Sequence, residues 1–274
     1  MILNEYRDSC VRRLERAGVY NPEGEFDRIA RAVFSGAVPP LGSTVSDADQ
    51  ARMEAIMVRR EQREPLARIL GTVTFYDLPI KVRSGVFRPY PETEFLVTSA
   101  AAHFPLHGPR RILDLGTGTG CVLLALLHLF PNATGIGVDN NRLAIALAQE
   151  NMRALNVDDR AAFRLSDWTE GAGEGFDLVV SNPPRVPSGK VSRLLPEMRD
   201  HDPVAAFDGG RDGLDYFRLI ARDFGRLASP GGVGVFQASD PSLVRQLFER
   251  AGHTRTHIEV NYLGIPHSVS VIRS

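Results

Sequence analysis

The segment from Arg111 to Leu129 constrains the fold of this chain more than any other. Its first five residues are typical of a short buried strand, apolar in its centre, with Asp114 near the end. Three glycines follow at alternate positions, namely Gly116, Gly118 and Gly120. The apolar run from Val122 then predicts a helix. A strand, a tight glycine turn and a helix N-terminus together let the backbone approach a nucleotide-like ligand. Glycine runs also mark ordinary turns, so the surrounding chain must decide between these interpretations.

The chain after this segment alternates between predicted strands and predicted helices. The strands are expected at residues 134–138, 161–165, 176–181 and 232–237. The helices between them are expected at residues 142–155, 214–227 and 242–251. Two further strands, at 257–262 and 267–272, follow one another without a helix. This order predicts an α/β protein with a doubly wound, mostly parallel sheet and an antiparallel C-terminal edge.

The N-terminal part of the chain has a different pattern. Apolar residues at three- and four-residue spacing predict three amphipathic helices within about 65 residues, a usual size for a small domain. Ser46 and Asp49 resemble a capping box at the start of the third helix. The alternating residues 72–82 predict a β-hairpin. We therefore expect a helical domain at 1–70, a hairpin linker at 71–86 and a main domain at 87–274. The helical domain either orients a substrate or is a structural cap.

Composition excludes several classes of protein. The 274 residues contain 32 Lys and Arg and 33 Asp and Glu, so the net charge is −1 and no overall field attracts nucleic acid. Cys10 and Cys121 lie far apart in apolar helical patterns, which disfavours a disulfide or zinc framework and favours a reducing compartment. The first residues lack the pattern of a signal peptide, and the longest apolar run is too short to cross a bilayer. We expect a cytoplasmic protein without membrane association.

Four successive predicted strands end at or near a polar residue, namely Asp114, Asp139, Asp167 and Asn182. In a sheet of this kind, ligands bind at the carboxyl ends of the strands. Asp139 lies about 25 residues after Asp114, near the separation at which an acidic residue reaches ribose hydroxyls. Asp167 and the neighbouring Trp168 are suited to an adenine, through a carboxylate acceptor and a flanking indole.

The glycine spacing argues against a dinucleotide. A pyrophosphate requires the G-x-G-x-x-G spacing, whereas the third glycine of this chain comes one residue early. No lysine of the P-loop type follows. These features favour a ligand with ribose and adenine but no phosphate, such as S-adenosylmethionine.

A second motif, Asn182-Pro183-Pro184, forms a rigid turn at a strand end. Proline lacks an N–H group, so the carbonyls beside it have fewer backbone partners. An Asn side-chain oxygen and a backbone carbonyl can together accept both hydrogens of one planar NH2 group. Such a clamp would orient a nitrogen for direct attack on a methyl sulfonium, with no need of a metal or a covalent intermediate.

Asp114 to Cys121, read together with Asn182-Pro183-Pro184, resembles the HemK-type glutamine methyltransferases, which methylate a glutamine side chain of peptide chain release factors. Pro65 to Gly71, Pro91 to Glu94 and Asp208 to Asp215 resemble further segments of that family. The resemblance implies a helical domain joined to a class I S-adenosylmethionine-dependent methyltransferase domain. It places the target nitrogen against Asn182 and Pro183.

On this basis we assign residues to three roles. The expected cofactor-binding residues are Asp114, Gly116, Thr117, Gly118, Gly120, Asp139, Asn140, Asp167, Trp168 and Asn182. The expected catalytic residues are Asn182 and Pro183. The expected substrate-binding residues are Pro184, Arg185 and Tyr90.

The chain also departs from the family pattern. Arg185 stands where the family has Tyr, Tyr90 where it has Arg, and Asp202 where it has Glu; Gln237 replaces an acidic residue, and Gly264 to His267 replaces a Gly-x-x-Arg pattern. A guanidinium prefers a carboxylate or phosphate partner. Arg185 therefore favours a small, carboxylate-bearing, amino-acid-like acceptor as the main hypothesis.

Three alternatives remain: methylation of a release-factor glutamine, methylation of adenine in nucleic acid, and a cofactor-binding scaffold without activity. The near-neutral charge disfavours the nucleic acid. The sequence leaves the oligomeric state open.

Overall fold

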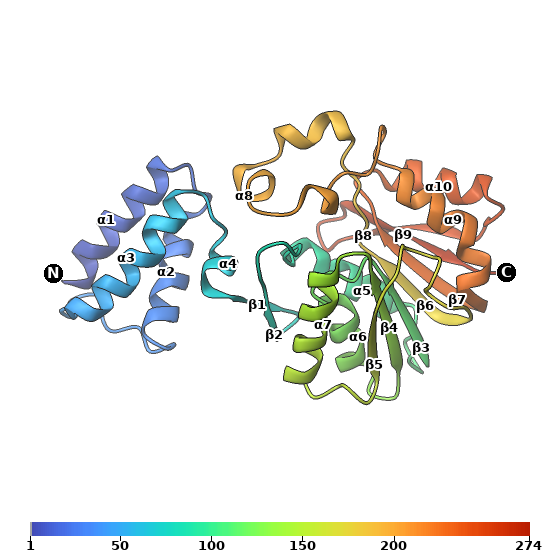
Figure 1. The fold of residues 1–274 in the computed structure, drawn as a ribbon, viewed down its shortest axis with the longest axis horizontal. Helices are drawn as coiled ribbons and strands as arrows, with labels where there is room; N and C mark the ends of the chain where they lie inside the picture. The colour runs from blue at the N-terminus through green and yellow to red at the C-terminus, as the bar shows by residue number, and fades with distance from the viewer. Residues whose placement is uncertain (1) are drawn as a thin grey trace. The chain divides into compact units, whose positions relative to one another are not determined.

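The computed structural model describes residues 2–274 (Figure 1), and these form two compact units. One unit comprises the chain up to Thr72 together with Leu195–His201, and the other comprises Val73–Leu194 and Asp202–Ser274. These limits differ from the expected domains in two respects. The hairpin packs as part of the second unit, and a short segment from the C-terminal half completes the first.

The first unit is helical, as the sequence predicts. Its helices are α1 (Leu3–Arg16), α2 (Pro22–Val33), α3 (Asp47–Glu61), the short α4 (Leu66–Leu70) and α8 (Pro196–Arg199). Their apolar stripes form one core that includes Leu14, Ile29 and Met57, each with no exposed surface. The expected cap of α3 is present, because the Ser46 hydroxyl accepts a hydrogen bond from the Asp49 N–H at 3.1 Å.

A buried ion cluster attaches α8 to the other helices of this unit. Glu197 accepts hydrogen bonds from Arg60 at 3.0 Å and from two nitrogens of Arg63 at 2.7 Å each. Arg60 also donates to Glu25 at 2.9 Å. The side chains of Arg60 and Glu197 are only 6% and 12% exposed. Leu195–His201 therefore belongs to the helical unit for an electrostatic reason that its local pattern does not reveal.

The second unit is built on a seven-stranded sheet in the order β5-β4-β3-β6-β7-β9-β8. The strands are β3 (Arg111–Leu115), β4 (Thr134–Asp139), β5 (Ala161–Leu165), β6 (Phe176–Ser181), β7 (Ala228–Gln237), β8 (Thr256–Val260) and β9 (Pro266–Ile272). The first five strands run parallel, and β9 pairs antiparallel with both β7 and β8, which confirms the predicted sheet with its antiparallel C-terminal edge. β7 begins earlier than expected, because Ala228 pairs with Phe176 before the register shifts.

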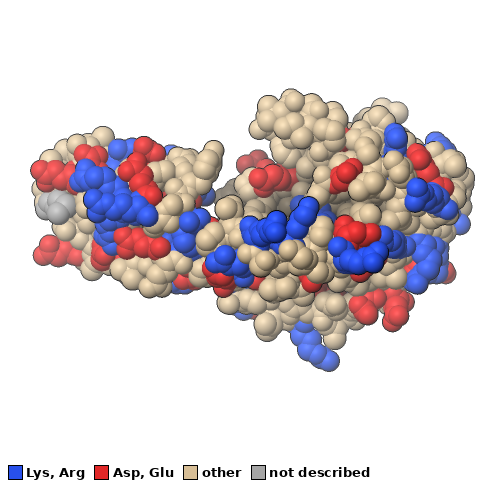
Figure 2. All heavy atoms as spheres, turned by 90° about the horizontal axis from the view of Figure 1, so that it is seen from above, with Lys and Arg blue, Asp and Glu red and all other residues tan. Residues whose placement is uncertain are grey.

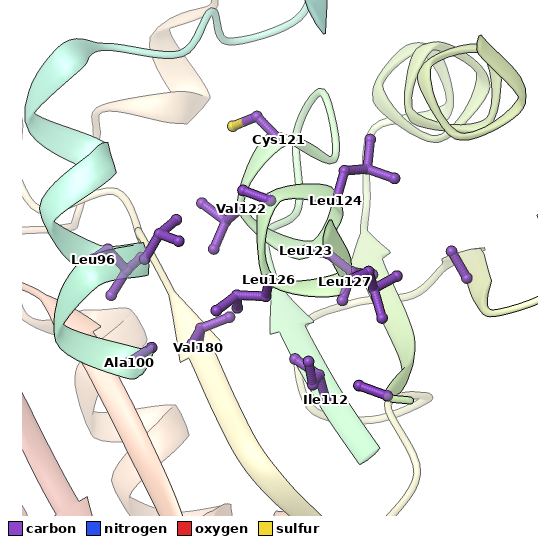
Figure 3. Packing of buried hydrophobic residues seen from close by; sticks show 14 of the residues in the cluster. Leu96, Ala100, Ile112, Cys121, Val122, Leu123, Leu124, Leu126, Leu127 and Val180 are labelled. Atoms are coloured by element: carbon purple, nitrogen blue, oxygen red, sulfur yellow. The ribbon is translucent and has the colours of Figure 1, made fainter. Parts of the chain in front are cut away.

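Helices cover both faces of this sheet. One face packs against α5 (Glu94–Ala102), α6 (Cys121–Leu129) and α7 (Arg142–Ala154), and the other against α9 (Asp215–Leu227) and α10 (Pro241–Arg250). Figure 3 shows side chains of α5 and α6 meeting Ile112 and Val180 of the sheet. Seven successive residues of α6 are buried, which explains its almost uninterrupted apolar sequence.

The remaining elements of the second unit are short. The predicted hairpin is formed by β1 (Thr72–Phe75) and β2 (Leu78–Lys81), and Asn151 of α7 accepts a hydrogen bond from the Lys81 N–H at 2.8 Å. Among residues 2–274, the 3₁₀ helices of this unit are η1 (Pro91–Thr93), η2 (Ser188–Arg193) and η3 (Val204–Ala206). Among the described residues, no helix combines the length and apolarity needed to cross a membrane.

The strand order identifies the edge of the sheet where a ligand is expected. The chain proceeds from β3 to β4 and β5 on one side and then returns to β6 on the other side of β3. Leu115 pairs with Val138 of β4 and with Ser181 of β6, so the loops after these three strands are neighbours. Such a switch in direction opens a crevice at the carboxyl ends of the strands.

Candidate active site

The glycine turn between β3 and α6 has a left-handed backbone at each glycine. The φ angles of Gly116, Gly118 and Gly120 are +69°, +56° and +81°, a region that side chains with a Cβ rarely adopt. The turn is held against β4, because the N–H groups of Gly116 and Thr117 both donate to the Val138 carbonyl at 2.9 Å.

Asp139, at the end of β4, braces this turn from the other side. One carboxylate oxygen accepts the Gly118 N–H at 2.9 Å, and the other accepts the Asn141 N–H at 2.8 Å. Burial raises the pKa of this carboxyl above its ordinary value, against the effect of these backbone hydrogen bonds. Each oxygen retains a further lone pair that can accept a ligand hydroxyl.

Asp114 is buried beneath the turn, with 2% of its surface exposed. Its carboxyl accepts a hydrogen bond from the Thr117 hydroxyl at 2.7 Å. Burial raises the pKa of Asp114 to about 7, the Thr117 hydrogen bond opposes this rise, and the charge of Asp139 adds to it. Two acidic groups therefore lie close together under one short turn.

A pocket of about 940 Å³, part of it open to solvent, lies over the turn. Its lining includes nine of the expected residues: Asp114, Gly116, Thr117, Gly118, Asp139, Asn140, Trp168, Asn182 and Pro184. It also includes residues that sequence reasoning missed, such as Phe87, Thr93, Asn141 and Ala206.

Five expected residues lie outside the pocket lining: Gly120, Asp167, Pro183, Arg185 and Tyr90. Gly120 has a packing role, since a Cβ on it would lie 2.8 Å from the ring of Phe163. Asp167 is exposed, two residues beyond the end of β5, and its contact with adenine stays a prediction.

Trp168 lines the pocket in a strained backbone conformation. Its φ is +50°, unusual for a bulky residue, and such strain is concentrated at functional sites. Its indole stacks on Tyr216 with ring centroids 4.1 Å apart. Tyr216 belongs to α9, which no local motif connects with the pocket.

Asn182 follows β6 at the edge of the pocket, and Thr93 of η1 fixes its amide. The side-chain N–H of Asn182 donates to the Thr93 hydroxyl at 3.1 Å. The preceding Ser181 is anchored as well, donating from its hydroxyl to the Leu115 carbonyl at 2.7 Å. This arrangement directs the Asn182 oxygen away from Thr93, so that it can accept a hydrogen bond from another group. The match of Pro91 to Glu94 with the family motif is the one sequence signal that points to Thr93.

The guanidinium of Arg185, which we expected to face a substrate carboxylate, contacts residues of its own motif. Its Nη1 donates hydrogen bonds to the Asn182 side-chain oxygen and to the Pro183 carbonyl, the latter at 3.4 Å. Burial lowers the pKa of Arg185 to about 10, and the charge of Glu92 acts in the opposite direction. Among the described residues, no carboxylate lies within ion-pair distance of Arg185. The guanidinium contacts the amide clamp itself.

Tyr90 belongs to a cluster outside the pocket. Its hydroxyl donates to Asp202 at 3.1 Å and accepts from Arg88 at 2.7 Å, and the Arg88 guanidinium lies 4.2 Å from the ring centroid. Two departures from the family pattern, Tyr90 and Asp202, are therefore in contact with each other. A substrate-binding role for Tyr90 stays a prediction.

Comparison with known proteins places this arrangement in a family. Residues 80–198 match the family model described as methyltransferase small domain. A release factor glutamine methyltransferase of Rhodospirillum rubrum is 40% identical over 237 residues, covering 85% of this chain and 73% of that protein. One of Agrobacterium fabrum is 37% identical over 263 residues, covering 92% and 91%. The chain belongs to the release factor glutamine methyltransferase family.

Solved structures support the fold of this family member. A methyltransferase from Pyrococcus furiosus has a TM-score of 0.54 at 17% identity, covering 72% of this chain and 89% of its own. A T. thermophilus 16S rRNA N2 G1207 methyltransferase has a TM-score of 0.53 at 21% identity, covering 74% and 50%. The resemblance and the predicted class I methyltransferase fold are confirmed, and the protein is an S-adenosylmethionine-dependent methyltransferase.

The residues around the glycine turn fit this cofactor chemically. S-adenosylmethionine carries a sulfonium and an ammonium cation, which suit a site that holds Asp114 and Asp139. Asp139 has acceptor capacity for ribose hydroxyls, and Trp168 offers an aromatic surface to adenine. When bound, the cofactor supplies the methyl group on its sulfonium.

Replacing Asp139 by Ala is expected to weaken cofactor binding about 30- to 150-fold, because the change removes charge-assisted hydrogen bonds worth roughly 2–3 kcal/mol together. The variant also loses the brace on Gly118. Isothermal titration with S-adenosylhomocysteine measures the change, with the exposed Asp158→Ala as the control. Equal dissociation constants for Asp139→Ala and the control would exclude this role.

Cofactor binding is expected to release a proton near pH 6. Burial raises the pKa of Asp114 in the folded protein to about 7, so this carboxyl is neutral in the ligand-free protein at pH 6. The neutral form contributes its full stability below about pH 4, and this contribution is lost as the pH rises through about 7. A cofactor of net positive charge favours the ionised carboxyl. Affinity should therefore increase between pH 6 and 8, by at most about tenfold per pH unit.

Titrations at pH 6 in buffers of different ionisation enthalpy measure the proton released on binding. Asp114→Asn cannot ionise and should abolish the release. Identical apparent enthalpies in all buffers for the unaltered protein would show that Asp114 does not change its protonation.

Proposed function

We propose that this protein methylates the side-chain amide nitrogen of a glutamine in a peptide chain release factor. The observation that supports it most directly is the amide clamp, formed by the Asn182 side-chain oxygen and the Pro183 carbonyl beside the cofactor pocket. Its relatives over most of the chain carry the name release factor glutamine methyltransferase. Together these favour a primary amide on a protein as the acceptor.

The clamp acts by orientation. An amide NH2 group has two hydrogens in one plane, and the two acceptors of the clamp can each hold one of them. The nitrogen then presents one face of that plane to the methyl donor, as direct displacement requires. Thr93 prevents Asn182 from turning its own NH2 group toward the substrate. As the bond between the amide nitrogen and the methyl carbon forms, the bond between that carbon and the sulfonium sulfur would break and leave a neutral thioether. The methylated nitrogen then releases a proton to solvent and is neutral again.

The small carboxylate-bearing acceptor expected from Arg185 is less well supported. That hypothesis requires a guanidinium directed toward a substrate carboxylate, whereas Arg185 donates to the clamp. The named relatives favour the release-factor alternative. Methylation of adenine in nucleic acid is disfavoured by the net charge of −1, and the face drawn in Figure 2 shows acidic and basic groups intermixed.

The direct test uses purified enzyme, labelled S-adenosylmethionine and a release factor that carries a Gly-Gly-Gln sequence. We expect one methyl group on the glutamine side chain, located by peptide mass spectrometry, and none on a release factor with that glutamine replaced by alanine. Free amino acids and an adenine-containing oligonucleotide are assayed in parallel. Methylation of either of these without methylation of the release factor would overturn the proposal.

A further inference from the structure

Arg185 presents a planar NH2 group to the clamp that we assign to the substrate amide. Nη1 of a guanidinium carries two hydrogens in one plane, as the nitrogen of a primary amide does. This one nitrogen donates to both the Asn182 side-chain oxygen and the Pro183 carbonyl. In chemical terms, Nη1 stands in for the glutamine Nε2.

We propose that Arg185 occupies the acceptor clamp in the substrate-free enzyme and is a specificity-determining residue that the substrate glutamine must displace. This inference rests on the proposed function, because it takes the clamp to be the amide site. The guanidinium does not act on the methyl group. It determines which amides gain access to Asn182 and Pro183.

The backbone beneath Arg185 is fixed, so displacement is confined to the side chain. A Cβ on Gly209 would lie 2.9 Å from the Arg185 Cα, and a Cβ on Gly213 would lie 2.6 Å from the Arg185 carbonyl oxygen. Val186 is anchored on both sides, donating to the Phe207 carbonyl at 2.8 Å and accepting from the Gly209 N–H at 2.9 Å. These glycines let the loop pack directly on the backbone of Arg185, which leaves rotation about its χ angles as the available motion.

The electrostatic surroundings make the resting contact displaceable. The charged or titratable side chains that act on Arg185 are those of Glu92 and His267. The Nε2–H of His267 donates a hydrogen bond to the Glu92 carbonyl at 2.9 Å. Burial lowers the pKa of His267, which favours the neutral ring. A half-buried guanidinium that lacks an ion pair still bears part of the desolvation penalty of a buried charge. Glu92 is exposed, so its carboxylate can receive the guanidinium after it leaves the clamp.

A clamp that is already occupied selects against small amides. An incoming amide gains only the two hydrogen bonds that Arg185 gives up, so a free primary amide has little net driving force. A protein acceptor brings binding energy from residues around the glutamine, and remote contacts of this kind can offset the displacement. The apparent affinity of either acceptor equals its affinity for the open clamp multiplied by the fraction of enzyme in which the clamp is open.

The test compares the unaltered enzyme with Arg185→Met, which keeps the apolar stem but cannot donate, and Arg185→Lys, which keeps the charge. Arg211→Met, at an exposed position of the same region, is the matched control. For a Gly-Gly-Gln release factor we expect Arg185→Met to lower KM about three- to tenfold, with kcat within twofold and unchanged cofactor affinity. Arg211→Met should behave like the unaltered enzyme.

A second measurement separates this inference from the proposed function. The affinity of a short Gly-Gly-Gln peptide for enzyme saturated with S-adenosylhomocysteine should increase by the same factor in Arg185→Met. An unchanged or weaker peptide affinity, or a raised KM, overturns the inference. If no enzyme form methylates the release factor but Arg185→Met binds the peptide more tightly, the result supports the occupation of the clamp by Arg185 and shows that the proposed acceptor is wrong.

Discussion

Replacing Asn182 by Ala is expected to lower kcat for methyl transfer about 100- to 1,000-fold. The change removes one of the two acceptors that orient the amide nitrogen, so the loss falls on turnover more than on binding. The dissociation constant for S-adenosylhomocysteine should change by only about threefold, since most of the pocket lining is unaltered. Single-turnover kinetics with saturating release factor measure the chemical step directly.

Thr93→Val provides a graded comparison for Asn182→Ala. It removes the hydroxyl that accepts the Asn182 N–H but keeps the side-chain shape, and it should cost about tenfold in kcat because the amide of Asn182 can then rotate. Thr93→Ser should restore most of the rate. If Asn182→Ala turns over as fast as the unaltered enzyme, the clamp has no part in the chemistry.

Replacing Glu197 by Ala is expected to lower the free energy of unfolding of the helical unit by about 3–5 kcal/mol. Glu197 is the common partner of Arg60 and Arg63 in a mostly buried cluster, so its removal leaves the charge of Arg63 without its carboxylate partner and takes one of two carboxylates from Arg60. Arg60 keeps Glu25, whereas Arg63 loses both of its bonds to Glu197.

Urea unfolding of the full chain, monitored by hydrogen exchange of the backbone amides in α1 to α3, measures the change in the stability of the helical unit. Glu15→Ala, at an exposed position of α1, is the control and should change stability by less than about 0.5 kcal/mol. Coincident unfolding curves for the Glu197 and Glu15 variants would show that the cluster does not stabilise the unit.

The parallel sheet and the pocket over the glycine turn could be predicted because their signals are local. Asp114 and Asp139 stand at the ends of apolar strands, and the carboxyl ends of parallel strands share one edge. Gly120 shows a limit of the same reasoning, since glycine spacing does not distinguish a residue that faces a ligand from one that admits Phe163. Whether Asp167 contacts adenine is a question that strand position alone does not answer.

The contacts that complete the site depend on distant segments. Thr93 meets Asn182 across 89 positions of the chain, and Tyr216 of α9 reaches Trp168, which lies in the turn after β5. Arg185 shows a different limit. Its chemistry indicated a carboxylate partner, but the position of the guanidinium depends on side-chain rotation, and its nearest acceptors proved to be residues of its own motif.

The membership of α8 in the helical unit has a consequence during synthesis of the chain. The first 72 residues leave the ribosome long before Glu197 does, so Arg60 and Arg63 must wait for their common partner. Nascent α1, α2 and α3 can pack their apolar core early, but the ion cluster closes only after β6 and the clamp motif have been made. A gene fragment ending at Thr72 would therefore encode a helical unit that lacks one of its own helices.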